Sequence, residues 1–212
     1  MGTAPRLTTR SLREAARRLA AADPALGASV ERYGTPPLWA REPSYATLVH
    51  LILEQQVSLA SAQAAFDKLG AAVGDVTPAA LSTLEDDQLR AIGFSRQKAG
   101  YARDLARAML DGFQLDALTD RPDSEVRREL MQHRGIGRWT ADIYLIMCLL
   151  RPDVWPHGDL ALTTAVMEVT GALARGSNEE LATLAERWSP HRAVAARILW
   201  HHYLQVRGLP ID

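Results

Sequence analysis

The feature that most constrains the fold of this chain is a succession of amphipathic helical segments bounded by residues that start or stop helices. Residues 10–22 place apolar and charged side chains at helical spacing, and Leu48, Val49 and Ile52 face one side of a second segment. No stretch alternates apolar and polar residues as a half-buried strand does. The sequence therefore predicts an all-α fold with roughly ten helices joined by short loops.

Helix boundaries follow from capping residues and glycines. Ser95 stands where a helix N-cap is expected, and Ser177 with Glu180 forms the pattern of a capping box. The pair Asp23-Pro24 is expected to end the first helix. We predict helices that begin near residues 10, 44, 58, 77, 86, 95, 123, 139, 159, 177 and 189.

The composition is that of an ordinary globular protein, with 47% hydrophobic and 23% charged residues among 212. This length suffices for one compact core or two small lobes. The longest apolar run, Ile143 to Leu150, is too short to span a bilayer, and residues 1–9 lack the apolar core of a signal peptide. We therefore expect a cytoplasmic protein that makes no membrane contact.

Metal-binding patterns are lacking in the sequence. The single cysteine, Cys148, excludes a zinc ribbon and a four-cysteine iron–sulfur cluster, and its apolar surroundings predict an inert core residue. His201 and His202 are adjacent, so on a helix they point about 100° apart and do not share a face. We therefore predict no metal site.

The formal net charge of −1 argues by itself against a nucleic-acid-binding protein, which is expected to be basic. Lys68 and Lys98 are, however, the only lysines, so nearly all of the positive charge is carried by arginine. Arginine is the better side chain for bidentate contacts with phosphate. Composition therefore leaves nucleic-acid binding open.

The most informative stretch is LMQHRGIGRWTAD, in which one predicted helix runs into a three-residue turn and a second helix begins at once. The backbone amides of Gly135 and Gly137, together with the start of the second helix, could point at one phosphate. Arg134 and Arg138 flank the turn and add positive charge. The alternative is a plain helical corner with Ile136 packed inside.

A longer run, RGIGRWTADIYLIMCLLRPDVWPHGDLAL, resembles the helix–hairpin–helix and Gly/Pro-loop–Asp signature of DNA glycosylases. Three further stretches fit this superfamily in the same order, at residues 51–63, 92–106 and 188–200. The resemblance covers about residues 23–207 and is strongest to the branch of the AlkA-type 3-methyladenine DNA glycosylases II.

This resemblance implies two helical lobes, a helix–hairpin–helix motif and an active site in the cleft between the lobes. Residues 43–155 would form the lobe that carries the hairpin, and residues 1–42 would pack with 159–212 to form the other, all in one catalytic unit. Too few residues precede the first motif for the β-rich N-terminal domain found in some members of the branch.

Asp159 follows the loop WPHG and precedes a predicted helix. Taken alone, it reads as an N-cap residue. The resemblance implies that it is the catalytic aspartate, and both readings can hold because a cap residue is fixed in position. A carboxylate can stabilise the cationic sugar that forms as an N-glycosidic bond breaks, and can orient or deprotonate a water molecule.

Lysine-using members of the superfamily carry their nucleophile at the second helix of the hairpin. Here that position reads Arg138, Trp139 and Thr140, which predicts a monofunctional hydrolase without lyase activity. The chemistry requires no cofactor, although the resemblance implies a monovalent cation at the hairpin.

The resemblance also implies an aromatic pocket for an extruded, electron-poor base. Trp139 and Trp200 match pocket positions, and Tyr144 or Trp39 could add a wall. Ordinary core packing is the alternative for each of these rings.

The gap that an extruded base leaves in the duplex has to be filled by an inserted side chain. Gln56 matches this wedge position, and Gln55 is the neighbouring candidate. The alternative is a polar helix end that faces solvent.

Predicted contacts with the DNA backbone lie at the hairpin and at a helix start after Gly93, where a solvated helix is the alternative. The residues are Arg134, Gly135, Ile136, Gly137, Arg138, Thr140, Ser95 and Lys98. Arg192 could brace the catalytic loop or contact the DNA backbone, and the sequence leaves both open.

The function expected from the resemblance is excision of alkylated bases, such as 3-methyladenine and 7-methylguanine, from double-stranded DNA. We expect a monomer without an obligate protein partner in the bacterial cytosol or nucleoid. The rival readings are a glycosylase for other damaged or mispaired bases, a non-catalytic helix–hairpin–helix DNA-binding protein and a purely structural helical protein.

Overall fold

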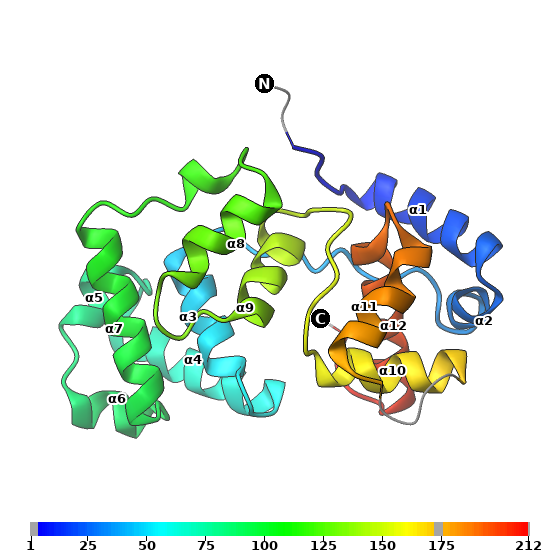
Figure 1. Ribbon diagram of the computed structural model, residues 1–212. Coiled ribbons are helices and arrows are strands. Elements are labelled where there is room, and N and C mark those ends of the chain that lie inside the picture. Colours follow the sequence, from blue (N-terminus) through cyan, green and yellow to red (C-terminus); the bar gives the residue numbers. More distant parts are fainter. Residues whose placement is uncertain (1–3, 172–175, 212) are drawn as a thin grey trace. The chain divides into compact units, whose positions relative to one another are not determined.

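The computed structural model describes residues 4–171 and 176–211, and every regular element in these ranges is helical (Figure 1). The all-α prediction is therefore confirmed. No helix within the described ranges is both long and apolar enough to cross a membrane. The α-helices are α1 (Thr9–Ala22), α2 (Pro24–Tyr33), α3 (Tyr45–Glu54), α4 (Leu59–Val73), α5 (Pro78–Ser82), α6 (Asp86–Ile92), α7 (Arg96–Leu110), α8 (Asp123–Met131), α9 (Arg138–Ile143), α10 (Leu160–Thr170), α11 (Asn178–Ala185) and α12 (Arg192–Val206).

The structure differs from the predicted helices at two places, for identifiable reasons. Asp23 ends α1, as expected, but its carboxylate also accepts hydrogen bonds from the backbone amides of Ala25 and Leu26. With Pro24 at the first helical position, these bonds start α2, a helix that was not predicted from the sequence.

The other difference concerns the helix predicted from residue 139. Helix α9 ends at Ile143 and continues into a π-helical turn, Tyr144–Cys148. This wider turn shifts the direction of the side chains that follow, which a regular 3.6-residue period cannot anticipate.

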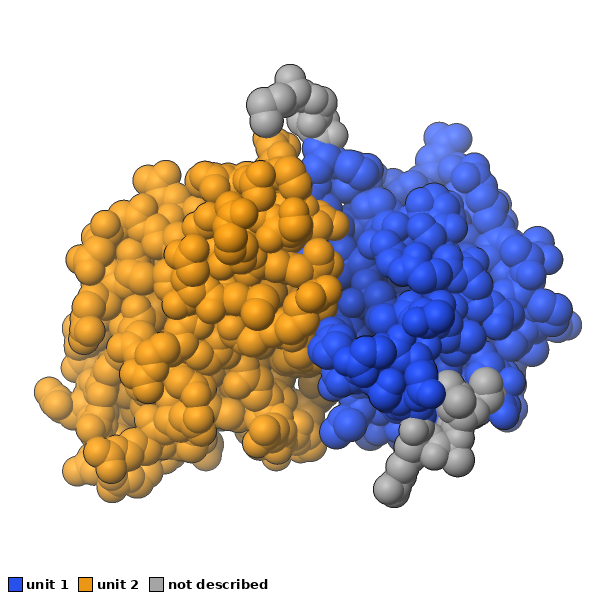
Figure 2. Space-filling model, viewed as in Figure 1, with its two compact units in different colours: residues 1–40, 145–212 blue, residues 41–144 orange. Residues whose placement is uncertain are grey.

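The chain divides into two compact units, which Figure 2 shows in different colours. Unit 1 comprises residues 1–40 and 145–212, and unit 2 comprises residues 41–144. The predicted lobes, 1–42 with 159–212 and 43–155, place the second boundary later. Residues 145–155 fall in unit 1 because the Leu150 carbonyl accepts from the amide of Leu7, and the Ile146 carbonyl accepts from Arg197.

Helix α12 forms the centre of unit 1 and packs against α1, α2 and α10. Its residues from Ala193 to His201 are buried, including Arg197, which has no exposed surface. The Arg197 guanidinium donates to the carbonyls of Leu38, Ala193 and Ile146 at 2.7–3.0 Å. Burial lowers the pKa of Arg197 to about 10, so the side chain remains charged at neutral pH and ties three segments together.

Helix α3 has the corresponding place in unit 2, where it packs against α4, α7 and α9. The predicted apolar face is confirmed, since Leu48, Val49 and Ile52 have no exposed surface. The end of α3 therefore lies at a fixed position relative to α7 and α9, and both of these helices carry residues of the candidate site.

Candidate functional site

Asp159 lies at the N-cap of α10, directly after an irregular loop of residues 151–158. Its Oδ1 atom accepts a hydrogen bond of 2.7 Å from the backbone amide of Leu162. The indole Nε1 of Trp200, on α12, donates to the same oxygen at 3.3 Å. The capping role is thus confirmed, and two donors from different helices fix the orientation of a half-buried carboxylate.

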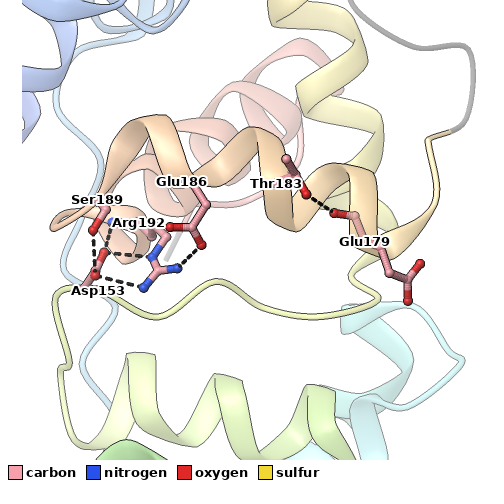
Figure 3. A network of polar contacts seen from close by, with 6 residues as sticks. All are labelled: Asp153, Glu179, Thr183, Glu186, Ser189 and Arg192. Carbon is pink, nitrogen blue, oxygen red and sulfur yellow. Dashed lines mark hydrogen bonds and ion pairs between the residues drawn. The ribbon is translucent and has the colours of Figure 1, made fainter.

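The loop before Asp159 is anchored by a group of polar side chains, drawn in Figure 3. We call Asp153, Glu186, Ser189 and Arg192 the Asp153 cluster. Asp153 accepts from the backbone amide, Nε and Nη2 of Arg192 at 2.9–3.1 Å and from the hydroxyl of Ser189 at 3.0 Å. Arg192 also donates to Glu186 at 2.7 Å. The guanidinium thus joins the loop to the start of α12, which is the bracing role that the sequence left open.

The ionised forms of Asp153 and Arg192 stabilise each other in this arrangement. Partial burial alone would raise the pKa of Asp153, but the hydrogen bonds and the positive charge of Arg192 lower it overall. The same pairing raises the pKa of Arg192 above its usual value. Both partners are therefore ionised at neutral pH, and their side chains are only about a quarter exposed.

The surroundings of Asp159 in unit 1 are tightly packed. Trp200 is buried, with 8% of its surface exposed. A cavity of about 10 Å³ beside Asp159, lined among others by Trp155 and Asn178, has room for roughly one water molecule. It is far too small for a base.

Trp39, the other predicted pocket residue in unit 1, has a positive φ of 48°. Its indole donates to the Ile211 carbonyl at 2.7 Å, and its ring meets His201 edge-on at 6.3 Å. His202 packs edge-on against Tyr33. In the part of the chain that is described, no three potential metal ligands lie together.

In unit 2, the turn between α8 and α9 brings a backbone segment very close to a side chain. Gly135 has φ +85°, and a β-carbon built on it would lie 2.3 Å from the ring of Tyr101. Gly137, the N-cap of α9, has open space around it and φ −90°. Ile136 is buried, as the structural reading of the corner requires. Only the first glycine is therefore sterically obligatory.

The two arginines that flank the turn are ion-paired but remain accessible. Arg134 contacts Asp104 at 3.2 Å, and 78% of its side chain is exposed. Arg138 contacts the fully buried Asp142 at 3.0 Å, and 52% of its side chain is exposed. Arg127 binds the second oxygen of Asp142 at 2.6 Å, which ties α8 to α9. Both arginines can thus present N–H groups to solvent, while pairing holds Arg134 to α7 and Arg138 to α9.

The predicted wedge residues differ in what they contact. Gln55 donates from Nε2 to the Gly135 carbonyl at 2.8 Å and to Thr140 Oγ1 at 3.0 Å. Gln56 is exposed and has a left-handed backbone with φ +59°. The geometry therefore brings Gln55, and not Gln56, onto the hairpin.

Lys98, predicted to contact the DNA backbone, directs its ammonium group to the carbonyls of Leu53 and Gln55 at 2.7 and 2.8 Å. Ser95 accepts from the Lys98 amide and caps α7, as the sequence indicates. The sequence did not predict the contacts of Gln55 and Lys98 or the close approach of Tyr101, because these contacts join residues far apart in the chain.

The other predicted pocket residues lie in unit 2. Trp139, in the first turn of α9, is half-buried, whereas Tyr144 has no exposed surface. Cys148, which belongs to unit 1, is buried as predicted. The roles proposed for the aromatic rings remain predictions.

The sequence matches known proteins that identify the family of this chain. Residues 49–191 match the HhH-GPD superfamily of base excision DNA repair proteins. The Bacillus subtilis protein YfjP, named provisionally as a DNA-3-methyladenine glycosylase, is 26% identical over 82% of this chain, and the match spans only 64% of that relative. Endonuclease III of Sulfolobus acidocaldarius is 34% identical over 77% of this chain and 72% of its own length.

A solved structure agrees with these matches. The 3-methyladenine DNA glycosylase of Schizosaccharomyces pombe, in complex with abasic DNA, superposes with a TM-score of 0.82 at 25% identity. The superposition covers 94% of this chain and 98% of that one. The turn between α8 and α9 and the loop that leads to Asp159 both fall within the matched region. The chain belongs to the HhH-GPD superfamily of base excision DNA repair proteins.

Proposed function

We propose that this protein is a monofunctional DNA N-glycosylase that excises alkylated bases, of the 3-methyladenine and 7-methylguanine type, by hydrolysis. The observation that carries the proposal is the fixed carboxylate of Asp159, which receives the Leu162 amide and the Trp200 indole on one oxygen. The names of YfjP and of the superposed yeast enzyme support the choice of substrate class.

In this mechanism the bond between the sugar C1′ and the base nitrogen breaks, and its electron pair leaves with the base. An alkylated purine that already carries a positive charge departs as a neutral molecule and needs little acid catalysis. Asp159 stabilises the cationic sugar and accepts a proton from the water molecule whose oxygen bonds to C1′. The proton then passes to solvent, and an abasic site remains.

We assign the predicted site residues as follows. Trp200 and Trp139 stack on the extruded base, with Trp39 as a further wall, and Gln56 fills the vacated space in the duplex. Tyr144 has no exposed surface, so we do not assign it to the pocket wall. The exposure of Gln56 supports its choice over Gln55, whose amide group is already bound to the hairpin. The cleft between the lobes stays a prediction of the sequence.

DNA backbone binding is assigned to the hairpin between α8 and α9 and to the start of α7. The exposed guanidinium groups of Arg134 and Arg138 support this assignment. Gly135, Ile136, Gly137, Thr140, Ser95 and Lys98 complete the predicted set. We further propose a monovalent cation at the hairpin, a monomeric protein and action in the cytosol or nucleoid.

The absence of lyase activity is part of the proposal, because Arg138, Trp139 and Thr140 leave no lysine at the position where other members carry one. A second candidate is a glycosylase for other damaged or mispaired bases, because one relative is named an endonuclease III and not an alkylated-base glycosylase.

The experiment is a base-release assay on duplexes that each contain one lesion: 3-methyladenine, 7-methylguanine, hypoxanthine, 1-methyladenine, uracil or 8-oxoguanine. We expect release of the methylated purines and an intact strand until the abasic site is cleaved by alkali. Release of uracil or 8-oxoguanine alone would overturn the alkylated-base assignment. Borohydride trapping of an enzyme–DNA adduct would overturn the monofunctional assignment.

A further inference from the structure

Gln56 has an unusual backbone conformation for an exposed loop residue. It lies between the end of α3 and the start of α4, and its φ of +59° falls in the left-handed region. A residue with a β-carbon is disfavoured there and persists only where its surroundings hold it. Its side chain is exposed, so the backbone conformation has to be held from neighbouring residues. The preceding residue, Gln55, is bound at both its side chain and its carbonyl.

Gln55 is held through its side chain. Both N–H groups of its amide are used, one on the Gly135 carbonyl at 2.8 Å and one on Thr140 Oγ1 at 3.0 Å. One acceptor belongs to the first residue of the Gly-Ile-Gly turn, and the other lies on α9 just after the turn. Thr140 is buried, with 1% of its surface exposed. The side chain of Gln55 is therefore fixed relative to the turn.

Gln55 is also held through its backbone. The Lys98 ammonium donates to the carbonyl of Gln55 at 2.8 Å and to that of Leu53 at 2.7 Å. Carbonyls at a helix C-terminus have no partner within the helix, and a cation is favourable there. Partial burial lowers the pKa of Lys98, in keeping with an ammonium group turned towards the protein. Lys98 therefore fixes the point at which the chain leaves α3.

We propose that Gln55 and Lys98 are positioning residues that hold the side chain of Gln56 at a fixed position relative to the hairpin. Because the same Gln55 is bound to the hairpin by its side chain and to Lys98 by its carbonyl, the residue that follows has little freedom. Insertion of Gln56 into the duplex and attachment of the hairpin to the backbone would then occur as one event. This inference rests on the proposed function and adds a coupling between its two DNA contacts.

The test measures insertion separately from bond cleavage. A duplex carries a tetrahydrofuran abasic analogue beside 2-aminopurine, whose fluorescence rises when stacking is broken. We expect Gln56→Ala to lose most of the wild-type fluorescence change. Gln55→Glu keeps the size of the side chain but places an acceptor against the Gly135 carbonyl, and we expect it to weaken the change about tenfold.

A double-variant cycle separates positioning from a general structural effect. If Gln55 acts through Gln56, the variant carrying both substitutions is no worse than Gln56→Ala alone. If the two losses multiply in full, the proposal is overturned. The matched control is Gln63→Ala, an exposed glutamine on α4 that bonds only to the neighbouring Asp67 among the described side chains, and it should match wild type.

Two further variants keep the test decisive if Gln55→Glu fails to fold. Thr140→Val removes one acceptor of Gln55, and Lys98→Met removes the group that binds its carbonyl. Each single substitution should lower the fluorescence change when Gln56 is present. Added to Gln56→Ala, neither should lower the remaining change further. A wild-type protein that binds the duplex without any fluorescence change would count against the proposed function itself. A normal wild-type change that Gln55→Glu, Thr140→Val and Lys98→Met all retain would overturn the positioning role alone.

Discussion

The loop before Asp159 and the turn between α8 and α9 are both short irregular segments that lead into a helix, but different chemistry holds them. The first is anchored by the ion pair of Asp153 with Arg192, supported by Ser189 and Glu186. The second is anchored by the neutral amide of Gln55 on a backbone carbonyl, and by the ring of Tyr101 against Gly135.

This contrast separates two tasks. The anchor in unit 1 fixes the position of one carboxylate, so its loss should slow the chemical step and leave DNA binding intact. The anchor in unit 2 fixes a surface that binds DNA, so its loss should weaken binding. A substitution in one anchor should therefore change one of these two properties and leave the other unchanged.

The largest effect is expected from one of two glycine substitutions in the hairpin, and the other serves as its control. Gly135→Ala places a β-carbon inside the ring of Tyr101 in a left-handed conformation, and should destabilise unit 2 by about 3 kcal/mol. Gly137→Ala meets open space, so its free energy of unfolding should stay near that of wild type. Urea unfolding and DNA affinity measure both. Equal losses from the two substitutions would contradict the steric account.

Next in size is the substitution Arg192→Ala, which removes the guanidinium from Asp153. We expect the single-turnover rate of base release to fall by about 10- to 100-fold, because the loop before Asp159 loses the two guanidinium hydrogen bonds that join it to α12. DNA affinity should not change. Arg207→Ala is the matched control, since this arginine pairs with Glu168 near the other end of α12. A fall in affinity without a fall in rate would reverse the assignment of the two regions.

A smaller effect concerns acid pH. In wild type the pKa of Asp153 is lowered overall, since the hydrogen bonds from Arg192 outweigh the raising effect of burial. Its contribution to stability is therefore complete above the unfolded pKa of about 4 and is lost as the pH falls through the lower folded value. Asp153→Asn should be less stable by about 2 kcal/mol at pH 7. Unfolding curves should show this gap closing below about pH 4, and a gap that persists at pH 2 would contradict the ion pair.

The smallest effect is expected from Trp200→Phe. This change keeps an aromatic ring but removes the indole N–H that donates to Asp159 at 3.3 Å. The rate of base release should fall by about 3- to 10-fold, with binding of undamaged DNA unchanged. A larger fall that is confined to one lesion would instead indicate that the indole selects the base.

The sequence was informative wherever a local rule applies. The caps at Ser95 and Ser177, the apolar face of α3 and the cap at Asp159 depend on neighbours within four residues, and the structure confirms them. Helix α2 was not predicted, because the single residue Asp23 both ends α1 and starts α2.

The rest depends on contacts between residues far apart in the chain. The amide of Gln55 reaches a carbonyl 80 positions away, and Trp200 reaches Asp159 across 41 positions. Neither spacing is fixed by a helical period, so neither contact could be predicted. The pairing of Arg192 with Asp153 is of the same kind, which is why the sequence left its role open.

The most direct test of the central claim is the single-turnover release of 7-methylguanine by Asp159→Asn. Asparagine is an equally good N-cap and can still accept from the Leu162 amide, so the melting temperature and the DNA affinity should match wild type. The account predicts a rate at least about 100-fold lower, because the carboxylate charge and the proton acceptor are lost together. A rate equal to that of wild type would contradict it.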